Sequence, residues 1–60
     1  MAELDISKVR FLIAEDNPFM RSKLRMLLGA FGVHDLAEAK DGAEAYHKLR
    51  DTQPDIILVD

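Results

Sequence analysis

The chain has 60 residues, a net charge of −3, 48% hydrophobic residues and no cysteine. A disulfide framework is therefore excluded, and the composition is that of a globular domain rather than a disordered one. The acidic balance, without a dense lysine or arginine block, argues against direct nucleic acid binding. No apolar stretch reaches the ~18 residues of a membrane span. The N-terminus does not resemble a signal peptide, so we expect a cytoplasmic protein.

The first expected element is a strand that follows a short flexible tail over residues 1–7, in which Leu4 and Ile6 could pack. The run VRFLIA, from Val9 to Ala14, is apolar on both of its alternating faces. Such a run fits either a strand buried on two faces or a piece of buried helix. Its short length and the break at the following EDNP favour the strand.

A helix is predicted over residues 18–31. Asn17 is a good N-cap, and Pro18 suits the first helical position because its missing N–H needs no partner there. Gly32 supplies the positive φ with which many helices end. Helical spacing forms one apolar stripe from Met20, Leu24, Leu27, Leu28 and Phe31. The basic residues Arg21, Lys23 and Arg25 lie mostly off this stripe, and we interpret them as a solvated face.

A short strand over residues 35–39 and a second helix are predicted next. The Asp41-Gly42 pair could form a hairpin turn, but AEAYHKLRD has helical spacing, which makes Asp41 an N-cap and Glu44 its capping-box partner. Pro54 ends this helix and favours an extended Gln53. The closing DIILVD, residues 55–60, predicts a third strand.

Alternation of strands and helices predicts an α/β fold of βαβαβ type with a parallel sheet and right-handed crossovers. Ligands of such sheets bind at the carboxyl ends of the strands. Glu15 and Asp16 follow the first strand and Asp60 follows the third, so the three carboxylates meet if these strands are neighbours. Two carboxylates about 4 Å apart repel by roughly 4 kcal/mol at an effective dielectric of 20. A compensating cation is therefore expected, and Mg²⁺ suits such an oxygen site.

Four sequence features in register resemble the receiver domain of bacterial two-component response regulators. They are IAED at the end of the first strand, the helix MRSKLRMLLGAFG, the stretch AEAKDGAEAYHKL and the closing PDIILVD. The resemblance covers residues 8–60. It implies the first half of a flavodoxin-like, doubly wound parallel sheet with strand order 2-1-3.

The resemblance also implies a role for each carboxylate. Asp60 is similar to the aspartate that accepts a phosphoryl group from a histidine kinase. Asp16 is similar to a direct Mg²⁺ ligand, and Glu15 to an acid that acts through a bound water. A phosphoacceptor of this kind is a signalling module rather than an enzyme. Kinase docking is a second hypothesis for Arg21, Lys23 and Arg25.

The family pattern continues beyond residue 60 with a metal-binding carbonyl, a Ser or Thr and a Lys. We therefore expect residues 1–60 to be the N-terminal part of a receiver domain that is inactive alone. The apolar third strand would then be an exposed edge, through which the isolated chain is expected to self-associate.

Two other functions remain open at this point. The segment LRMLLGAFGVHDLAEA has a glycine-containing turn between helical patterns, as in a helix-turn-helix DNA-binding module. Another α/β phosphotransfer or phosphatase enzyme could also use a strand-end aspartate such as Asp60 as its nucleophile.

Overall fold

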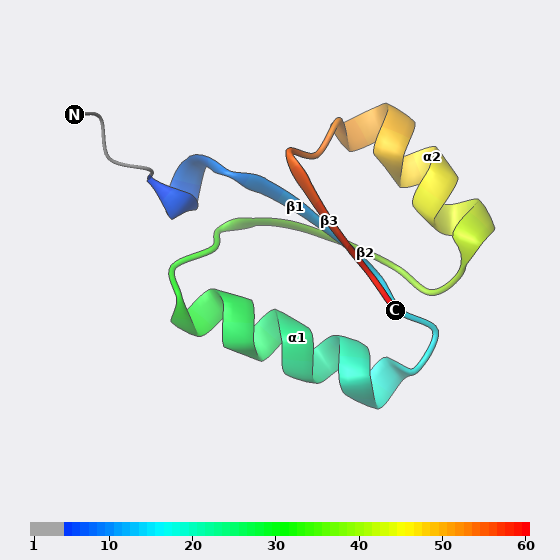
Figure 1. Ribbon diagram of the computed structural model, residues 1–60, viewed down its shortest axis with the longest axis horizontal. Coiled ribbons are helices and arrows are strands. Elements are labelled where there is room, and N and C mark those ends of the chain that lie inside the picture. The colour runs from blue at the N-terminus through cyan, green and yellow to red at the C-terminus, as the bar shows by residue number, and fades with distance from the viewer. Residues whose placement is uncertain (1–4) are drawn as a thin grey trace.

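Three strands and two helices alternate along the chain in the computed structural model, which describes residues 5–60 (Figure 1). The elements are a 3₁₀ turn η1 (Ile6–Lys8), β1 (Arg10–Ala14), α1 (Pro18–Ala30), β2 (Asp35–Ala39), α2 (Gly42–Thr52) and β3 (Ile56–Val59). The predicted α/β class is confirmed. The helix-turn-helix alternative is wrong, because the second half of its segment forms β2 and extends a sheet. Within the described residues, neither helix is long and apolar enough to cross a bilayer.

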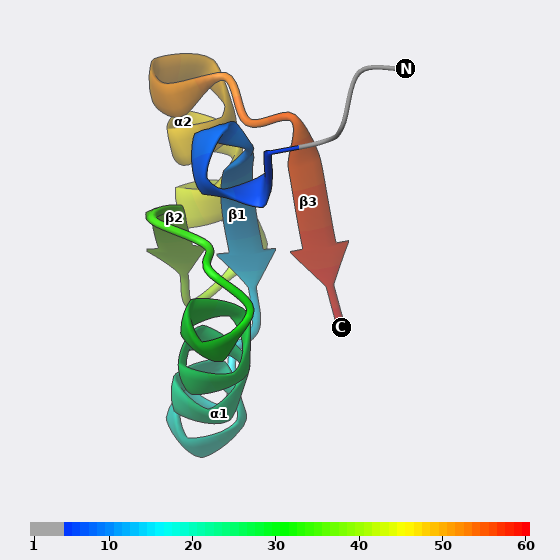
Figure 2. The same cartoon turned by 90° about the vertical axis from the view of Figure 1, so that its left-hand side faces the viewer.

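The strands form one parallel sheet in the order β2-β1-β3, as predicted. Figure 2 shows the three strands side by side, all running in the same direction. In the register, Ile13 of β1 lies between Glu38 of β2 and Leu58 of β3. The carboxyl ends of all three strands therefore lie at the same edge of the sheet. This arrangement is consistent with part of a flavodoxin-like fold.

The helices α1 and α2 lie on opposite sides of the sheet, so the central strand β1 is covered on both faces (Figure 1). Successive side chains of a strand point to opposite faces. Leu12 and Ile13 are accordingly 1% and 0% exposed, although they point in opposite directions. The continuous apolar run of β1 reflects this burial on two faces.

A buried apolar cluster lies beside α1 at the start of β1. Val9, Phe11 and Val33 form it, and Leu28 of α1 packs against it together with Ile6. The predicted flexible tail over residues 1–7 therefore includes a packed turn at η1, since Ile6 gains apolar contacts there. Residues 1–4 lie outside the described residues.

The apolar stripe predicted for α1 is buried only in part. Leu28 packs against the core, but Leu27 and Phe31 are 54% and 66% exposed. Among the strands, α1 mainly contacts β1. The sheet of the described chain is thus too narrow to cover the whole stripe.

The helix ends follow the predicted capping chemistry with one change. The Asn17 side chain accepts hydrogen bonds from the N–H groups of Phe19 and Met20, and Asp41 accepts one from Glu44. Glu44 does not return a bond to the N–H of Asp41, as a capping box would require. Its carboxylate instead accepts from the N–H of Lys40, one residue earlier, at 3.4 Å.

The prediction of an extended Gln53 is wrong. Gln53 has φ 49° and ψ 62°, which is the left-handed conformation, although Pro54 follows it. Its N–H donates to the Leu49 carbonyl at 3.1 Å and closes the last turn of α2. The hydrogen bond at the helix end, together with the direction that the chain must take into β3, outweighs the local preference before proline.

Candidate functional site

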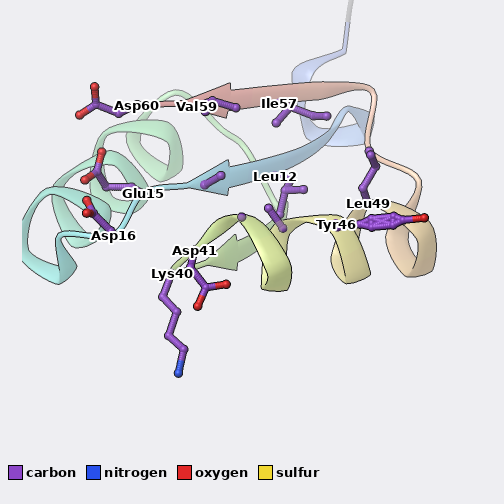
Figure 3. Close-up of a pocket in the computed structure, with 13 residues that line it drawn as sticks. Leu12, Glu15, Asp16, Lys40, Asp41, Tyr46, Leu49, Ile57, Val59 and Asp60 are labelled. Carbon is purple, nitrogen blue, oxygen red and sulfur yellow. The ribbon is translucent and has the colours of Figure 1, made fainter.

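Three carboxylates gather at the carboxyl edge of the sheet, as the sequence predicted for strands one and three. Glu15 follows β1 directly, and its N–H donates to the Ala39 carbonyl at the end of β2 at 3.0 Å. Asp60 follows β3, and its N–H donates to the Ala14 carbonyl at 3.3 Å. Figure 3 shows Glu15, Asp16 and Asp60 together at one end of the sheet. Main-chain hydrogen bonds therefore fix the positions of Glu15 and Asp60.

Glu15 is the buried member of this group. It is 4% exposed, whereas Asp16 and Asp60 are exposed. One carboxylate oxygen, Oε1, accepts a hydrogen bond from the Asn17 N–H at 3.0 Å. The other oxygen, Oε2, is buried without a hydrogen-bond partner. A buried polar atom without a partner carries a large desolvation cost, so Oε2 marks a place where a ligand could compensate.

The neighbouring acids raise the pKa of Glu15. The hydrogen bond from the Asn17 backbone N–H lowers this pKa. Contact with the Asp60 carboxyl, burial and the Asp16 carboxyl act in the other direction, and their sum places the pKa of Glu15 above its ordinary value. The raised pKa reflects negative charges that are close together and incompletely neutralised.

Ion pairs with the basic side chains of the described residues do not neutralise this cluster. Within residues 5–60, no lysine or arginine forms an ion pair with Glu15, Asp16 or Asp60. Lys40 is near the same edge, but Figure 3 shows its side chain pointing away from the three acids. In the described part of the chain, no set of three acidic, histidine or cysteine side chains could by itself hold a metal ion. The site can therefore supply only part of a cation's coordination shell.

The acidic cluster opens to both faces of the sheet. A groove of about 540 Å³ lies on the α2 side, with Leu12, Tyr46 and Ile57 among its apolar residues. A second groove, of about 430 Å³, lies on the α1 side beside Met20 and Leu24. Glu15 and Asp60 line both grooves. A partner molecule could thus reach these carboxylates over apolar walls.

The interpretation of Arg21 as part of a solvated helix face is wrong. Its Nη1 donates to the Glu15 carbonyl at 2.8 Å, and its Nε lies 3.5 Å from Glu38 Oε1. No signal in the sequence identifies this contact, because its acceptor is a main-chain carbonyl six residues earlier. Lys23 does face outward and lies over the Phe19 ring, 4.5 Å from its centroid.

The family model for the response regulator receiver domain matches residues 11–60. This match includes β1 from its second residue, β2, β3, both helices and all three carboxylates. It therefore covers most of the chain and the whole candidate site.

Curated relatives from bacteria and archaea are similar to the chain over most of its length. Chemotaxis protein CheY of Bacillus subtilis is 37% identical over 51 residues, which are 85% of this chain and 42% of the relative. A gliding motility regulatory protein of Myxococcus xanthus is 40% identical over 53 residues, 88% of this chain and 7% of the relative. A protein-glutamate methylesterase/protein-glutamine glutaminase of Haloarcula marismortui is 36% identical over 52 residues, 87% of this chain and 14% of the relative. The chain thus spans less than half the length of each. No solved structure matches it significantly.

Proposed function

This chain belongs to the response regulator receiver domain family, and we propose that it takes a phosphoryl group onto Asp60 in a two-component signalling pathway. The observation that carries the proposal is the cluster of Glu15, Asp16 and Asp60, which no described basic residue neutralises. Phosphoryl transfer depends mainly on positioning and on neutralising negative charge. An acidic edge that lacks its counter-charge fits this chemistry.

The donor set fits Mg²⁺. This ion prefers oxygen ligands, keeps several waters and is often bound through one or two carboxylates plus substrate phosphate. Asp16 and Asp60 would hold it directly, and the partnerless Oε2 of Glu15 would reach it through a bound water. When bound, Mg²⁺ would neutralise charge on the carboxylates and on the phosphoryl oxygens.

Asp60 is the best placed of the three acids to act as the nucleophile. It is exposed at the end of β3, so a partner can approach it, whereas Glu15 is buried and already accepts from Asn17. One Asp60 oxygen would form a bond to phosphorus while the bond between phosphorus and a kinase histidine nitrogen breaks. The imidazole nitrogen keeps the electron pair of the broken bond, and Asp60 becomes an acyl phosphate. The chain is then a phosphoacceptor, and the partner is a histidine kinase or a phosphotransfer protein.

The alternative of another phosphotransfer or phosphatase enzyme uses the same strand-end aspartate. The family match over residues 11–60 favours the receiver, because it includes both helices as well as the strand that ends at Asp60. That residues 1–60 are the N-terminal part of a longer receiver domain stays a prediction, as does the cytoplasmic location.

Self-association through β3 is part of the same proposal for the isolated chain. Among the described residues β3 pairs only with β1, so its outer edge has no partner strand. Ile57 and Val59 on this strand are 41% and 76% exposed. Unpaired apolar edges favour pairing with further strands.

A chimera tests the proposed function. Residues 11–60 replace the matched segment of the Bacillus subtilis chemotaxis protein, and the product is incubated with acetyl phosphate and Mg²⁺. We expect acid-stable but base-labile phosphate in the chimera and in its D51N variant, which changes an exposed acid of α2. The D60N variant should incorporate none. Equal incorporation by D60N, in folded protein, would contradict the assignment of Asp60.

A further inference from the structure

Glu15 is held at three atoms, and Arg21 supplies one of the three contacts. The Glu15 N–H is bonded to Ala39 of β2, and Oε1 is bonded to the Asn17 N–H. The third contact is the 2.8 Å hydrogen bond from Arg21 Nη1 to the Glu15 carbonyl. This carbonyl belongs to the peptide unit that joins Glu15 to Asp16. Its orientation therefore fixes the direction in which the chain presents both acids, since a peptide unit is planar.

Arg21 is itself fixed by a second strand. Its Nε lies 3.5 Å from Glu38 Oε1, and its side chain is only 21% exposed. Glu38 sits on β2, where its own carbonyl accepts a hydrogen bond from Lys48 Nζ at 2.6 Å. The guanidinium thus bridges the β1–α1 loop and β2 with two different nitrogens. A lysine has one ammonium group and cannot reproduce this fork.

We propose that Arg21 is a positioning residue that orients the Glu15–Asp16 peptide for cation binding. The inference rests on the proposed function, because it assigns Arg21 a role toward the cation that this site would take. Partners that orient metal ligands typically contribute 10–100-fold to metal affinity.

Charge and orientation predict opposite results when Arg21 is replaced. Loss of a nearby positive charge by itself would strengthen the binding of a cation to the acids. Loss of the orienting hydrogen bond would weaken it. Arg25 offers the matched control, because it lies one turn further along α1 and also pairs with Glu38, at 3.2 Å. The Arg25 side chain donates hydrogen bonds to Glu38 and Ser22, so it does not hold Glu15.

The experiment compares the 60-residue chain with its R21Q, R21K and R25Q variants by NMR. Mn²⁺ is the probe, because it takes the same oxygen ligands as Mg²⁺ and broadens the signals of nearby amides. We expect Mn²⁺ binding at Glu15, Asp16 and Asp60 to weaken about tenfold in R21Q and R21K, and to be unchanged or tighter in R25Q. Without metal, hydrogen exchange of the Asn17 amide should be faster in R21Q and R21K than in R25Q.

Slow amide exchange at Leu12 and Ile13 shows that a variant is folded. If R21Q does not fold, the comparison uses R21K, which keeps the positive charge. The inference is overturned if Asn17 exchanges equally fast in the Arg21 and Arg25 variants, or if R21Q binds Mn²⁺ as tightly as the original chain. Absence of Mn²⁺ binding in the original chain would instead count against the proposed metal site. The Asn17 exchange rates would still decide whether Arg21 holds the loop.

Discussion

At the scale of single residues, Glu15 combines a fixed position with an unfavourable charge. Its carboxylate is buried next to Asp60 and Asp16, and Oε2 has no hydrogen-bond partner. Folding therefore raises the pKa of Glu15 above its ordinary value. Because the folded-state pKa is raised, the fold is more stable when Glu15 is protonated than when it is charged. This stabilisation is complete below the ordinary pKa and is lost as the pH rises through the folded-state pKa.

Replacing Glu15 with Gln should therefore stabilise the chain at neutral pH. Gln keeps an oxygen that can accept from the Asn17 N–H but carries no charge. We expect a higher midpoint of thermal unfolding for E15Q than for the original chain at pH 7, measured by circular dichroism. The difference should disappear as the pH falls below the ordinary pKa of a glutamate. D51N, which neutralises an exposed acid, should show no such pH-dependent difference. A lower midpoint for E15Q at pH 7 would contradict this account.

The three acids could be predicted from the sequence, but Arg21 could not. A carboxylate that follows an apolar run marks the end of a strand, and parallel strands end at one edge. The positions of Glu15 and Asp60 therefore follow from the chain order and the strand order. Arg21 depends on where a side chain of α1 meets a main-chain carbonyl. The distance between the Arg21 guanidinium and the Glu15 carbonyl is set by helix packing. No pattern of residues in the sequence indicates it.

At the scale of secondary-structure elements, α2 ends with a strained residue. Gln53 adopts the left-handed conformation, which costs roughly 1–2 kcal/mol for a residue with a Cβ atom. Glycine would remove this cost. Its greater conformational entropy in the unfolded chain would, however, offset roughly 0.4–1 kcal/mol of the gain in stability. We therefore expect Q53G to raise the free energy of unfolding by about 0.5–1 kcal/mol in urea titrations.

The control for Q53G is A45G, which replaces an alanine inside α2 with glycine and should lower the free energy of unfolding by about 1 kcal/mol. If Q53G destabilised the chain as much as A45G, the left-handed end of α2 would not exist in solution.

The outer edge of β3 has no partner strand among the described residues, so it can pair with another chain. Lys in place of Ile57 puts a charge on an exposed apolar strand and should hinder edge pairing. We expect sedimentation velocity to show concentration-dependent association of the original chain and less association of I57K. M26K adds the same charge at a residue of α1 that is 72% exposed and should leave association unchanged. A folded monomer at every micromolar concentration tested would rule out association through β3.

Element types and helix starts followed from local patterns, whereas the conformation at the end of α2 and the extent of burial did not. Asn17 and Asp41 fix the helix starts by their side-chain chemistry. Gln53 departs from its local preference because the hydrogen bond to Leu49 and the path into β3 decide its conformation. Phe31 and Leu27 remain exposed because periodicity shows which residues share a face, but not how much of that face the sheet covers.

At the scale of the whole molecule, the described residues provide three acids, among them the proposed nucleophile Asp60, but no cation of their own at the site. The sheet places the three carboxylates at one edge, and no described lysine or arginine forms an ion pair with them. An incoming phosphoryl group would add further negative charge there, which one Mg²⁺ ion would offset only in part. We therefore expect the isolated 60-residue chain to remain essentially unlabelled by acetyl phosphate and Mg²⁺ under conditions that label the chimera. Stoichiometric labelling, measured by intact mass, would show that the described residues are sufficient.

The most direct test of the central claim identifies the residue that receives phosphate. An acyl phosphate on aspartate is reduced by borohydride to homoserine, so the modified position can be read by peptide mass spectrometry. The phosphorylated chimera is reduced, digested and sequenced across residues 11–21 and 54–60. We predict homoserine at position 60, with Asp16 and Asp55 unchanged. Homoserine at Asp16, or phosphate recovered only on a hydroxyl or imidazole group, would contradict the assignment of Asp60 as the phosphoacceptor.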